Sequence, residues 1–260
     1  MRKLKAKRIV VKIGTNTITD KRGKVDLKVI KNVSEQISNL KSNGKEVMII
    51  TSGAIGAGMQ ELNLAKKPGN VIMKQVCAGV GQNILMSNYY SFFSKLGIKI
   101  SQILLTYEDF KNEKTFKNLK NSINKMLDME IVPVINENDP ISIDEIGPSF
   151  GDNDNLSALI ASRLKADLMV ILTNVDGLFN KDPSLGDAKL VMEVNKIDDK
   201  VESMAGKPSS LGIGGMRSKI QAAKIATDSG VNVVIANGKE KNILMKVLNN
   251  EEIGTVFYAK

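Results

Sequence analysis

Short apolar stretches alternate along the chain with longer segments whose apolar residues recur every three or four positions. Residues 8–14 read RIVVKIG and predict a buried strand. Residues 27–40 place five apolar side chains at helical spacing, and Gly44 predicts the end of that helix. Because apolar, β-branched strands alternate with helices, we expect an α/β fold, an open αβα sandwich whose mostly parallel central sheet is covered on both faces.

The same alternation continues to the last residues. Further strands are predicted around residues 47–50, 98–105, 131–139, 167–177, 231–238 and 254–260. Further helices are predicted around residues 118–129, after residue 155 and at 216–230. Residues 51–59 are expected to form a glycine-rich loop after the second strand. Residues 187–215 have the least regular pattern, and we expect a mobile flap there.

The composition excludes several classes of protein. Of the 260 residues, 42% are hydrophobic and 25% are charged, which argues against disorder. No apolar run approaches the roughly 20 residues that span a bilayer, and the basic N-terminus lacks a secretory signal. We therefore expect a cytoplasmic protein with no membrane partner. With Cys77 as the single cysteine and no histidine, an intrachain disulfide, a histidine base and a histidine-ligated zinc site are impossible.

The formal net charge of +9 has three interpretations. The first is nucleic-acid binding, but aromatic residues make up only 4% of the chain and tryptophan is absent, so stacking platforms are scarce. The second is a scatter of lysines over solvated faces, which we favour. The third is attraction of small polyanions such as nucleotide phosphates.

Polar residues and glycines gather where four of the predicted strands end. In parallel sheets, ligands bind beyond the carboxyl ends of the strands. Lys12 interrupts the first apolar run, which is costly unless the charge is paired or functional, and Gly14 lets the backbone approach an anion. The sequence GIGGMRSK places Lys219 in the first turn of a predicted helix, where free backbone N–H groups and a lysine suit a phosphate.

The segment FGDNDNLSALIA, residues 150–161, concentrates carboxylates and amides at the start of a predicted helix. A calcium-binding EF-hand loop is excluded, because it would need glycine and glutamate where Ser157 and Arg163 stand. A helix cap explains one polar residue, Asp154 or Asn155. Together with the NEND sequence that ends at Asp139, the cluster suits a zwitterionic ligand, whose ammonium group carboxylates can hold.

Six stretches together resemble the amino acid kinase family, in the family's order and over nearly the whole chain: VVKIGTNTIT, TSGAIGAGM, VPVINENDPI, GDNDNLSALIA, LTNVDGLFNKDP and GIGGMRSKIQAA. The resemblance implies one amino acid kinase domain over residues 1–260, with glutamate bound by about residues 1–165 and nucleotide by about residues 166–260. It implies ATP-dependent phosphorylation of the side-chain carboxylate of L-glutamate to L-glutamyl 5-phosphate, the first step towards proline.

The resemblance also implies site residues. Lys12 and Lys219 are expected to stabilise the transferred phosphoryl group, and Asp154 to position both lysines. The expected substrate-binding residues are Ser52, Gly53, Ala54, Asn136, Asp139, Asp152 and Asn153. The expected ATP-binding residues are Lys12, Gly14, Thr173, Asn174, Ile213, Gly214, Gly215, Met216, Arg217, Ser218 and Lys219. ATP and Mg²⁺ are the implied cofactors, although no protein ligand of a metal is assigned.

The chain departs from the family pattern in two ways. Asn174 stands where the family commonly has aspartate, and we expect no C-terminal PUA domain, an RNA-binding-like module of longer members. Residues 141–150 correspond to the loop with which members sense proline, so feedback inhibition by proline is a hypothesis, as is a homodimer or homotetramer. The competing interpretations are a sibling kinase, such as one acting on acetylglutamate, and a non-catalytic regulator that binds nucleic acid.

Overall fold

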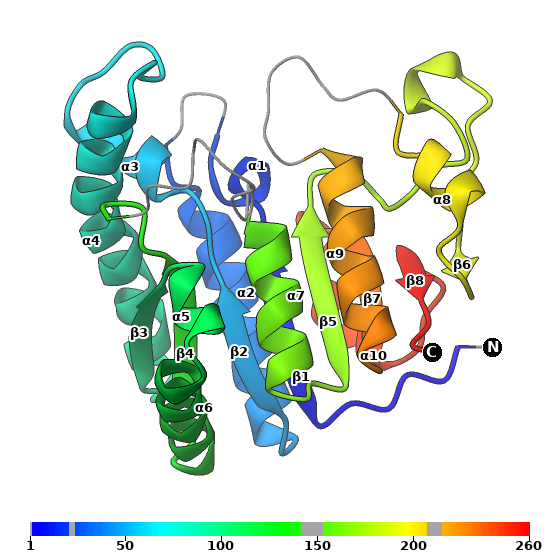
Figure 1. Ribbon diagram of the computed structural model, residues 1–260, viewed down its shortest axis with the longest axis horizontal. Coiled ribbons are helices and arrows are strands. Elements are labelled where there is room, and N and C mark those ends of the chain that lie inside the picture. Colours follow the sequence, from blue (N-terminus) through cyan, green and yellow to red (C-terminus); the bar gives the residue numbers. More distant parts are fainter. Residues whose placement is uncertain (1, 21–23, 142–152, 207–214) are drawn as a thin grey trace. The chain divides into compact units, whose positions relative to one another are not determined.

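The computed structural model describes residues 2–20, 24–141, 153–206 and 215–260 (Figure 1). The chain divides into two units: Met1–Lys12 together with Phe150–Lys260 form unit 1, and Ile13–Ser149 form unit 2. Unit 1 therefore combines the first residues of the chain with its second half, whereas unit 2 is one continuous segment.

Unit 1 contains the strands that come first and last in the chain. They are β1 (Arg8–Ile13, which ends at the boundary between the units), β5 (Leu168–Thr173), β6 (Glu193–Val194), β7 (Asn232–Asn237) and β8 (Thr255–Phe257). Strands β5 and β7 are parallel over their full length, whereas β8 is antiparallel to β7. The helices are α7 (Asn153–Arg163), α8 (Asp199–Ser203), α9 (Met216–Asp228) and α10 (Ile243–Leu248). Helices α7 and α9 pack beside each other over β5 (Figure 1).

Unit 2 contains three parallel strands: β2 (Glu46–Ile50), β3 (Ile100–Leu105) and β4 (Val132–Glu137). Its helices are α1 (Thr15–Ile18), α2 (Leu27–Ser42), α3 (Ala54–Glu61), α4 (Val71–Lys95), α5 (Glu108–Lys111) and α6 (Glu113–Asp128). Over the described part of the chain, the strands form an eight-stranded sheet in the order β3-β4-β2-β1-β5-β7-β8-β6. The predicted α/β fold with a mostly parallel sheet is confirmed.

The continuous apolar runs produce strands that are buried along almost their whole length. Every residue of β5 is buried, and β1 and β2 are buried after their first residue. This is expected for parallel strands that helices cover on both faces. Strand β3, at one end of the strand order, has only its last residue, Leu105, buried.

Two expectations about irregular segments were partly wrong. Residues 187–206 contain β6, which pairs with β8, and α8, which Asp198 caps by accepting from the Val201 N–H. A two-residue strand is too short to produce a recognisable periodicity. The glycine-rich loop at residues 51–59 is also mostly helix, because α3 begins at Ala54. Residues 207–214 lie outside the described part of the chain.

Glycines bring α3 and α4 unusually close together. A Cβ atom on Gly58 would lie 1.8 Å from the carbonyl oxygen of Cys77, and one on Gly81 would lie 1.9 Å from that of Ala54. Real Cβ atoms do not approach so closely, and the obstacles are backbone atoms that cannot rotate away. The two helices can therefore pack in this register only with glycine at both positions.

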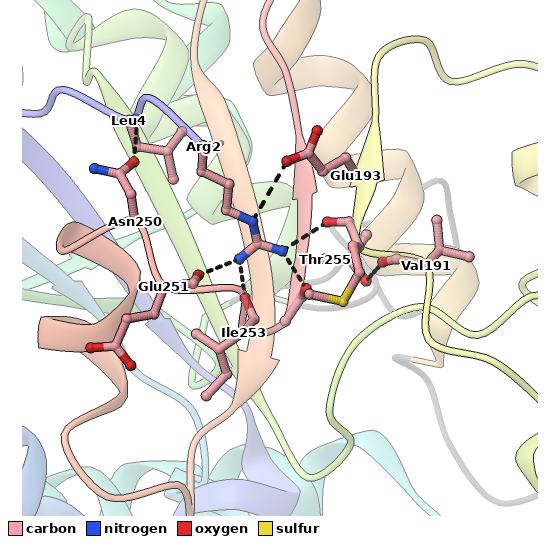
Figure 2. Close-up of polar contacts among 10 residues, drawn as sticks. Arg2, Leu4, Val191, Glu193, Asn250, Glu251, Ile253 and Thr255 are labelled. Carbon is pink, nitrogen blue, oxygen red and sulfur yellow. Dashed lines mark hydrogen bonds and ion pairs between the residues drawn. The ribbon is translucent and has the colours of Figure 1, made fainter.

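The second residue of the chain is buried in unit 1. Arg2 is 3% exposed, and its guanidinium donates hydrogen bonds to four backbone carbonyls (Figure 2). These acceptors belong to Met192, Glu251, Ile253 and Gly254. The carboxylate of Glu193 lies 3.9 Å from Arg2 Nε. Arg2 thus ties the start of the chain to the loop before β8 and to the residues around β6.

The close packing of α3 and α4 gives a first prediction. Gly58→Ala should lower the free energy of unfolding by about 3 kcal/mol or more, because overpacking forces backbone to move. Helix propensity alone would favour alanine by about 1 kcal/mol. The matched control is Gly69→Ala, where an added Cβ meets nothing within 4 Å. It should change stability by no more than about 0.5 kcal/mol in urea denaturation. Equal stabilities of the two variants would contradict the packing.

Candidate functional site

Two lysines and one aspartate from distant parts of the chain meet in unit 1. Lys12 Nζ lies 2.6 Å from Asp154 Oδ1, and Lys219 Nζ lies 3.1 Å from Asp154 Oδ2. Ser218 Oγ donates a further hydrogen bond of 2.8 Å to Oδ2. We call Lys12, Asp154 and Lys219 the lysine–aspartate cluster. The family resemblance implied that these residues share one site, and the structure brings their side chains together.

Local structure places each side chain of the cluster. Lys12 is the fifth residue of β1, Asp154 is the second residue of α7, and Lys219 is the fourth residue of α9. The carboxyl end of β1 and the first turns of the two helices therefore meet. Asp154 and Asn155 lie inside α7, which begins at Asn153, so the expectation that either one caps the helix was wrong. Asp154 uses its carboxylate for the lysines instead.

The cluster is almost completely withdrawn from water. Lys12 is 1% exposed, Asp154 is 0% exposed and Lys219 is 6% exposed. Burying charges costs free energy, and attraction between opposite charges recovers it only in good geometry. The formal charges of the three side chains sum to +1, because two ammonium groups share one carboxylate. A buried site with surplus positive charge suits an anion, such as a transferred phosphoryl group.

Apart from Gly14, the candidate nucleotide-binding residues belong to unit 1. Thr173 ends β5 and is buried, and Asn174 follows it and is exposed. Gly215 immediately precedes α9, whose first turn has no side-chain cap, and a Cβ there would meet nothing within 4 Å. The same turn contains Met216, Arg217 and Ser218. Ile213 and Gly214 lie outside the described residues.

Backbone N–H groups at the start of α9 provide an anion site of the kind that helix N-termini offer. The Ser218 hydroxyl is 2.9 Å from the Gly215 carbonyl and 2.8 Å from Asp154 Oδ2, so it links this turn to the cluster. Gly14, at the other end of the predicted set, precedes α1 in unit 2.

Unit 2 contains most of the candidate amino-acid site. Ser52 follows β2 and is 5% exposed, and Ala54 begins α3. Gly53 between them has φ +98°, a left-handed conformation that favours glycine, and a Cβ there would crowd the side chains of Ile18 and Thr19.

Two further candidates lie within β4 or just after it. Asn136 is the fifth residue of β4 and is 2% exposed, and Asp139 lies in the turn after the strand. Asn153 belongs to unit 1 as the first residue of α7, and Asp152 lies outside the described residues. Of the candidate proline-sensing loop at residues 141–150, all but Ile141 lie outside them as well.

Sequence analysis missed two polar side chains on α4. Gln82 Oε1 accepts a hydrogen bond of 2.8 Å from Asn136 Nδ2, and the Tyr89 hydroxyl is 3.0 Å from Thr51 Oγ1. Both residues of α4 are buried. The signal in the sequence is their spacing with Leu85, since positions 82, 85 and 89 share one helix face. A buried face that includes a glutamine and a tyrosine indicates specific polar partners.

The positions of the acidic side chains show whether the protein could hold a metal ion by itself. Over the described residues, no group of three or more histidine, cysteine, aspartate or glutamate side chains is placed to hold a metal ion. Mg²⁺ commonly binds through one or two carboxylates together with substrate phosphates. The described side chains therefore do not form a complete set of metal ligands without the substrate.

The helices within the described residues are all too short or too polar to span a membrane.

Comparisons with known proteins identify clear relatives. The sequence profile of the amino acid kinase family matches residues 7–237 of the chain. A glutamate 5-kinase of Methanosarcina barkeri is 47% identical over 97% of this chain and 68% of its own length. A glutamate 5-kinase of Clostridium perfringens is 44% identical over 98% of this chain and 96% of its own length.

Solved structures share the fold at low sequence identity. A UMP kinase from Bacillus anthracis has a TM-score of 0.66 at 16% identity, with 97% of this chain and 96% of that chain covered. A UMP kinase from Ureaplasma parvum has a TM-score of 0.65 at 16% identity, with 98% of this chain and 99% of that chain covered. At this level of identity, the likeness concerns the fold alone.

The shared carboxylate gives a second prediction. Asp154→Asn removes the negative charge that two buried ammonium groups contact, so it should lower the free energy of unfolding by about 3–5 kcal/mol. The control is Glu202→Gln, which breaks the exposed Lys224–Glu202 ion pair. That change should leave the urea midpoint unaltered, because water already solvates both groups. A stable Asp154→Asn protein would show that the cluster is not held by this carboxylate.

Proposed function

Because the chain belongs to the amino acid kinase family, we propose that it transfers the γ-phosphoryl group of ATP to the side-chain carboxylate of L-glutamate. The products are ADP and L-glutamyl 5-phosphate. The relatives named glutamate 5-kinase support this substrate, since they align with almost the whole chain. The observation that carries the proposal is the buried lysine–aspartate cluster.

The composition fits this reaction. A glutamate carboxylate has a reference pKa of about 4.3, so it is already ionised near neutral pH and needs no general base. The absence of histidine is therefore no obstacle. In the transfer, a carboxylate oxygen bonds to the γ-phosphorus while the bond from that phosphorus to the β–γ bridging oxygen breaks. The enzyme must align two anions and neutralise the charge that develops on the ADP oxygen.

The lysine–aspartate cluster supplies these requirements. Lys12 and Lys219 approach Asp154 through different carboxylate oxygens, so the two ammonium groups are held at separate points. In the proposed reaction they stabilise the transferred phosphoryl group. Asp154 acts through the lysines, and Ser218 fixes the carboxylate oxygen that faces Lys219. The first turn of α9 and the end of β5, with Thr173 and Asn174, then bind the nucleotide.

The amino acid is assigned to the ends of β2 and β4. Ser52 and the backbone of Gly53 and Ala54 offer hydroxyl and N–H groups for its carboxylates. Asn136 offers an amide, and Asp139 attracts its ammonium group. Asp152 and Asn153 are proposed as ligands from the sequence resemblance alone. Mg²⁺ is proposed to enter with ATP, held by phosphate oxygens and water, and it would neutralise phosphate charge. None of the roles given to side chains depends on a metal held by the protein.

Proline biosynthesis, feedback inhibition by proline, a cytoplasmic location and assembly into a homo-oligomer accompany this proposal. The free ammonium group of the substrate separates it from a sibling kinase acting on acetylglutamate. The decisive measurement is ADP release with L-glutamate, ATP and Mg²⁺, with hydroxylamine added to trap the acyl phosphate. If the protein phosphorylates N-acetyl-L-glutamate and not L-glutamate, it is an acetylglutamate kinase and the proposal is wrong.

Lys219 provides the third prediction. Lys219→Ala should lower kcat by about 100-fold or more, because a charge that stabilises the transition state is lost. The KM for glutamate should change little, because Lys219 is not assigned to that ligand. Lys224→Ala, five residues later on α9 and in an exposed ion pair, is the control and should retain activity. A raised KM for glutamate with kcat intact would contradict the role of Lys219.

A further inference from the structure

Gln82 on α4 fixes the side chain of a predicted substrate ligand. Its Oε1 accepts from Asn136 Nδ2 at 2.8 Å, and Asn136 Oδ1 in turn accepts from the Glu137 backbone N–H at 3.0 Å. An amide can rotate by half a turn and exchange its donor and acceptor, but these two contacts distinguish its oxygen from its nitrogen. Gln82 and the Glu137 N–H together therefore hold the Asn136 amide in one orientation.

The amide nitrogen of Gln82, Nε2, is buried at a cost in free energy. Gln82 is 6% exposed, and its Nε2 is buried without a hydrogen-bond partner among the described residues. Most buried polar atoms in proteins are satisfied, because an unpaired N–H loses its hydration without compensation. The hydrogen bond of Gln82 is made by Oε1, to Asn136.

The backbone around Gln82 is held in place. The neighbouring Gly81 lies so close to α3 that a Cβ would be 1.9 Å from the Ala54 carbonyl oxygen. Because Ala54 belongs to the candidate amino-acid site, the helix register that sets Gln82 against Asn136 also sets α4 against that site. Sliding α4 along α3 would disturb both at once.

A second polar contact on the same face of α4 reaches the end of β2, beside the candidate ligand Ser52. Tyr89 lies two turns after Gln82, is fully buried, and its hydroxyl is 3.0 Å from Thr51 Oγ1. Burial raises the pKa of Tyr89, so the hydroxyl stays neutral. Thr51 directly precedes Ser52. Helix α4 thus contacts the polar residues at the ends of both β2 and β4, the two strands to which the amino acid is assigned.

We propose that Gln82 is a positioning residue for the amino-acid substrate, acting through Asn136. It orients the Asn136 amide towards glutamate and has no part in nucleotide binding or in the lysine–aspartate cluster. This inference rests on the proposed function, because it takes Asn136 as a ligand of glutamate. It adds a residue of α4 to a site that the sequence motifs place only at the strand ends.

Gln82→Met tests the inference, because methionine has a similar length but offers only a weak sulfur acceptor in place of the amide oxygen. The KM for glutamate should rise about 10-fold, equivalent to about 1.4 kcal/mol, and the KM for ATP should change less than about 2-fold. The melting temperature should stay within about 2 °C, because the lost hydrogen bond is offset by removal of the unpaired Nε2. A structural role alone would lower the melting temperature and leave the two KM values unchanged.

The control is Gln36→Met on α2. Gln36 is also a buried glutamine beside an asparagine, and its Nε2 is 3.2 Å from Asn32 Oδ1. This variant should leave the KM for glutamate unchanged.

A double-mutant cycle with Asn136→Ala then tests whether Gln82 affects glutamate binding through Asn136. If Gln82 acts through Asn136, Gln82→Met should have no further effect in the Asn136→Ala protein. Should either variant lose measurable turnover, the rise in melting temperature on adding glutamate reports binding directly.

The outcomes separate the two proposals. A wild-type protein that does not phosphorylate glutamate overturns the proposed function, and the inference with it. An active wild type with an unchanged glutamate KM in Gln82→Met overturns the inference alone. So do independent, additive effects in the cycle, or equal rises in the KM values for glutamate and ATP. A selective rise in the glutamate KM that disappears in the Asn136→Ala background supports it.

Discussion

Two buried ammonium groups sharing one carboxylate are the constraint on which unit 1 depends. Lys12, Asp154 and Lys219 come from a strand and two helices that are far apart in the sequence. Such a group is stable only when each charge reaches its partner, because none of them is well solvated. The end of β1 and the first turns of α7 and α9 must therefore be placed with ångström accuracy. The surplus positive charge then makes the same point in the fold receptive to phosphate.

Unit 2 uses close packing where unit 1 uses charge. Gly58 and Gly81 let the backbones of α3 and α4 approach more closely than any other residue would allow. This contact fixes the helix whose buried polar side chains reach the ends of β2 and β4. In the proposed function, nucleotide chemistry and amino-acid recognition would thus rest on different forces. Substitutions that weaken one unit's constraint need not weaken the other's.

Much of the fold could be predicted from the sequence, because strands buried along most of their length produce mainly apolar runs such as residues 8–13 and 168–173. The two-residue strand β6 could not, because its edge pairing depends on β8, some 60 residues away. Gly58 was interpreted as part of a loop, since glycine disfavours helices and only the contact with Cys77 explains it. The lysine–aspartate cluster required the family resemblance, because spacing along the chain does not reveal which charges meet. Gln82 was missed because a glutamine on a helix ordinarily faces water.

The arrangement of Arg2 has a consequence for synthesis on the ribosome. Its carbonyl partners lie 190 to 252 residues later in the chain. Unit 2 is continuous, so all of its residues have been synthesised once residue 149 has been added. Arg2 must instead wait until residue 254 has been added before all four of its carbonyl acceptors exist. Closing so distant contacts is slow, and during that interval Arg2 and the residues beside it are exposed to proteases, chaperones and other nascent chains.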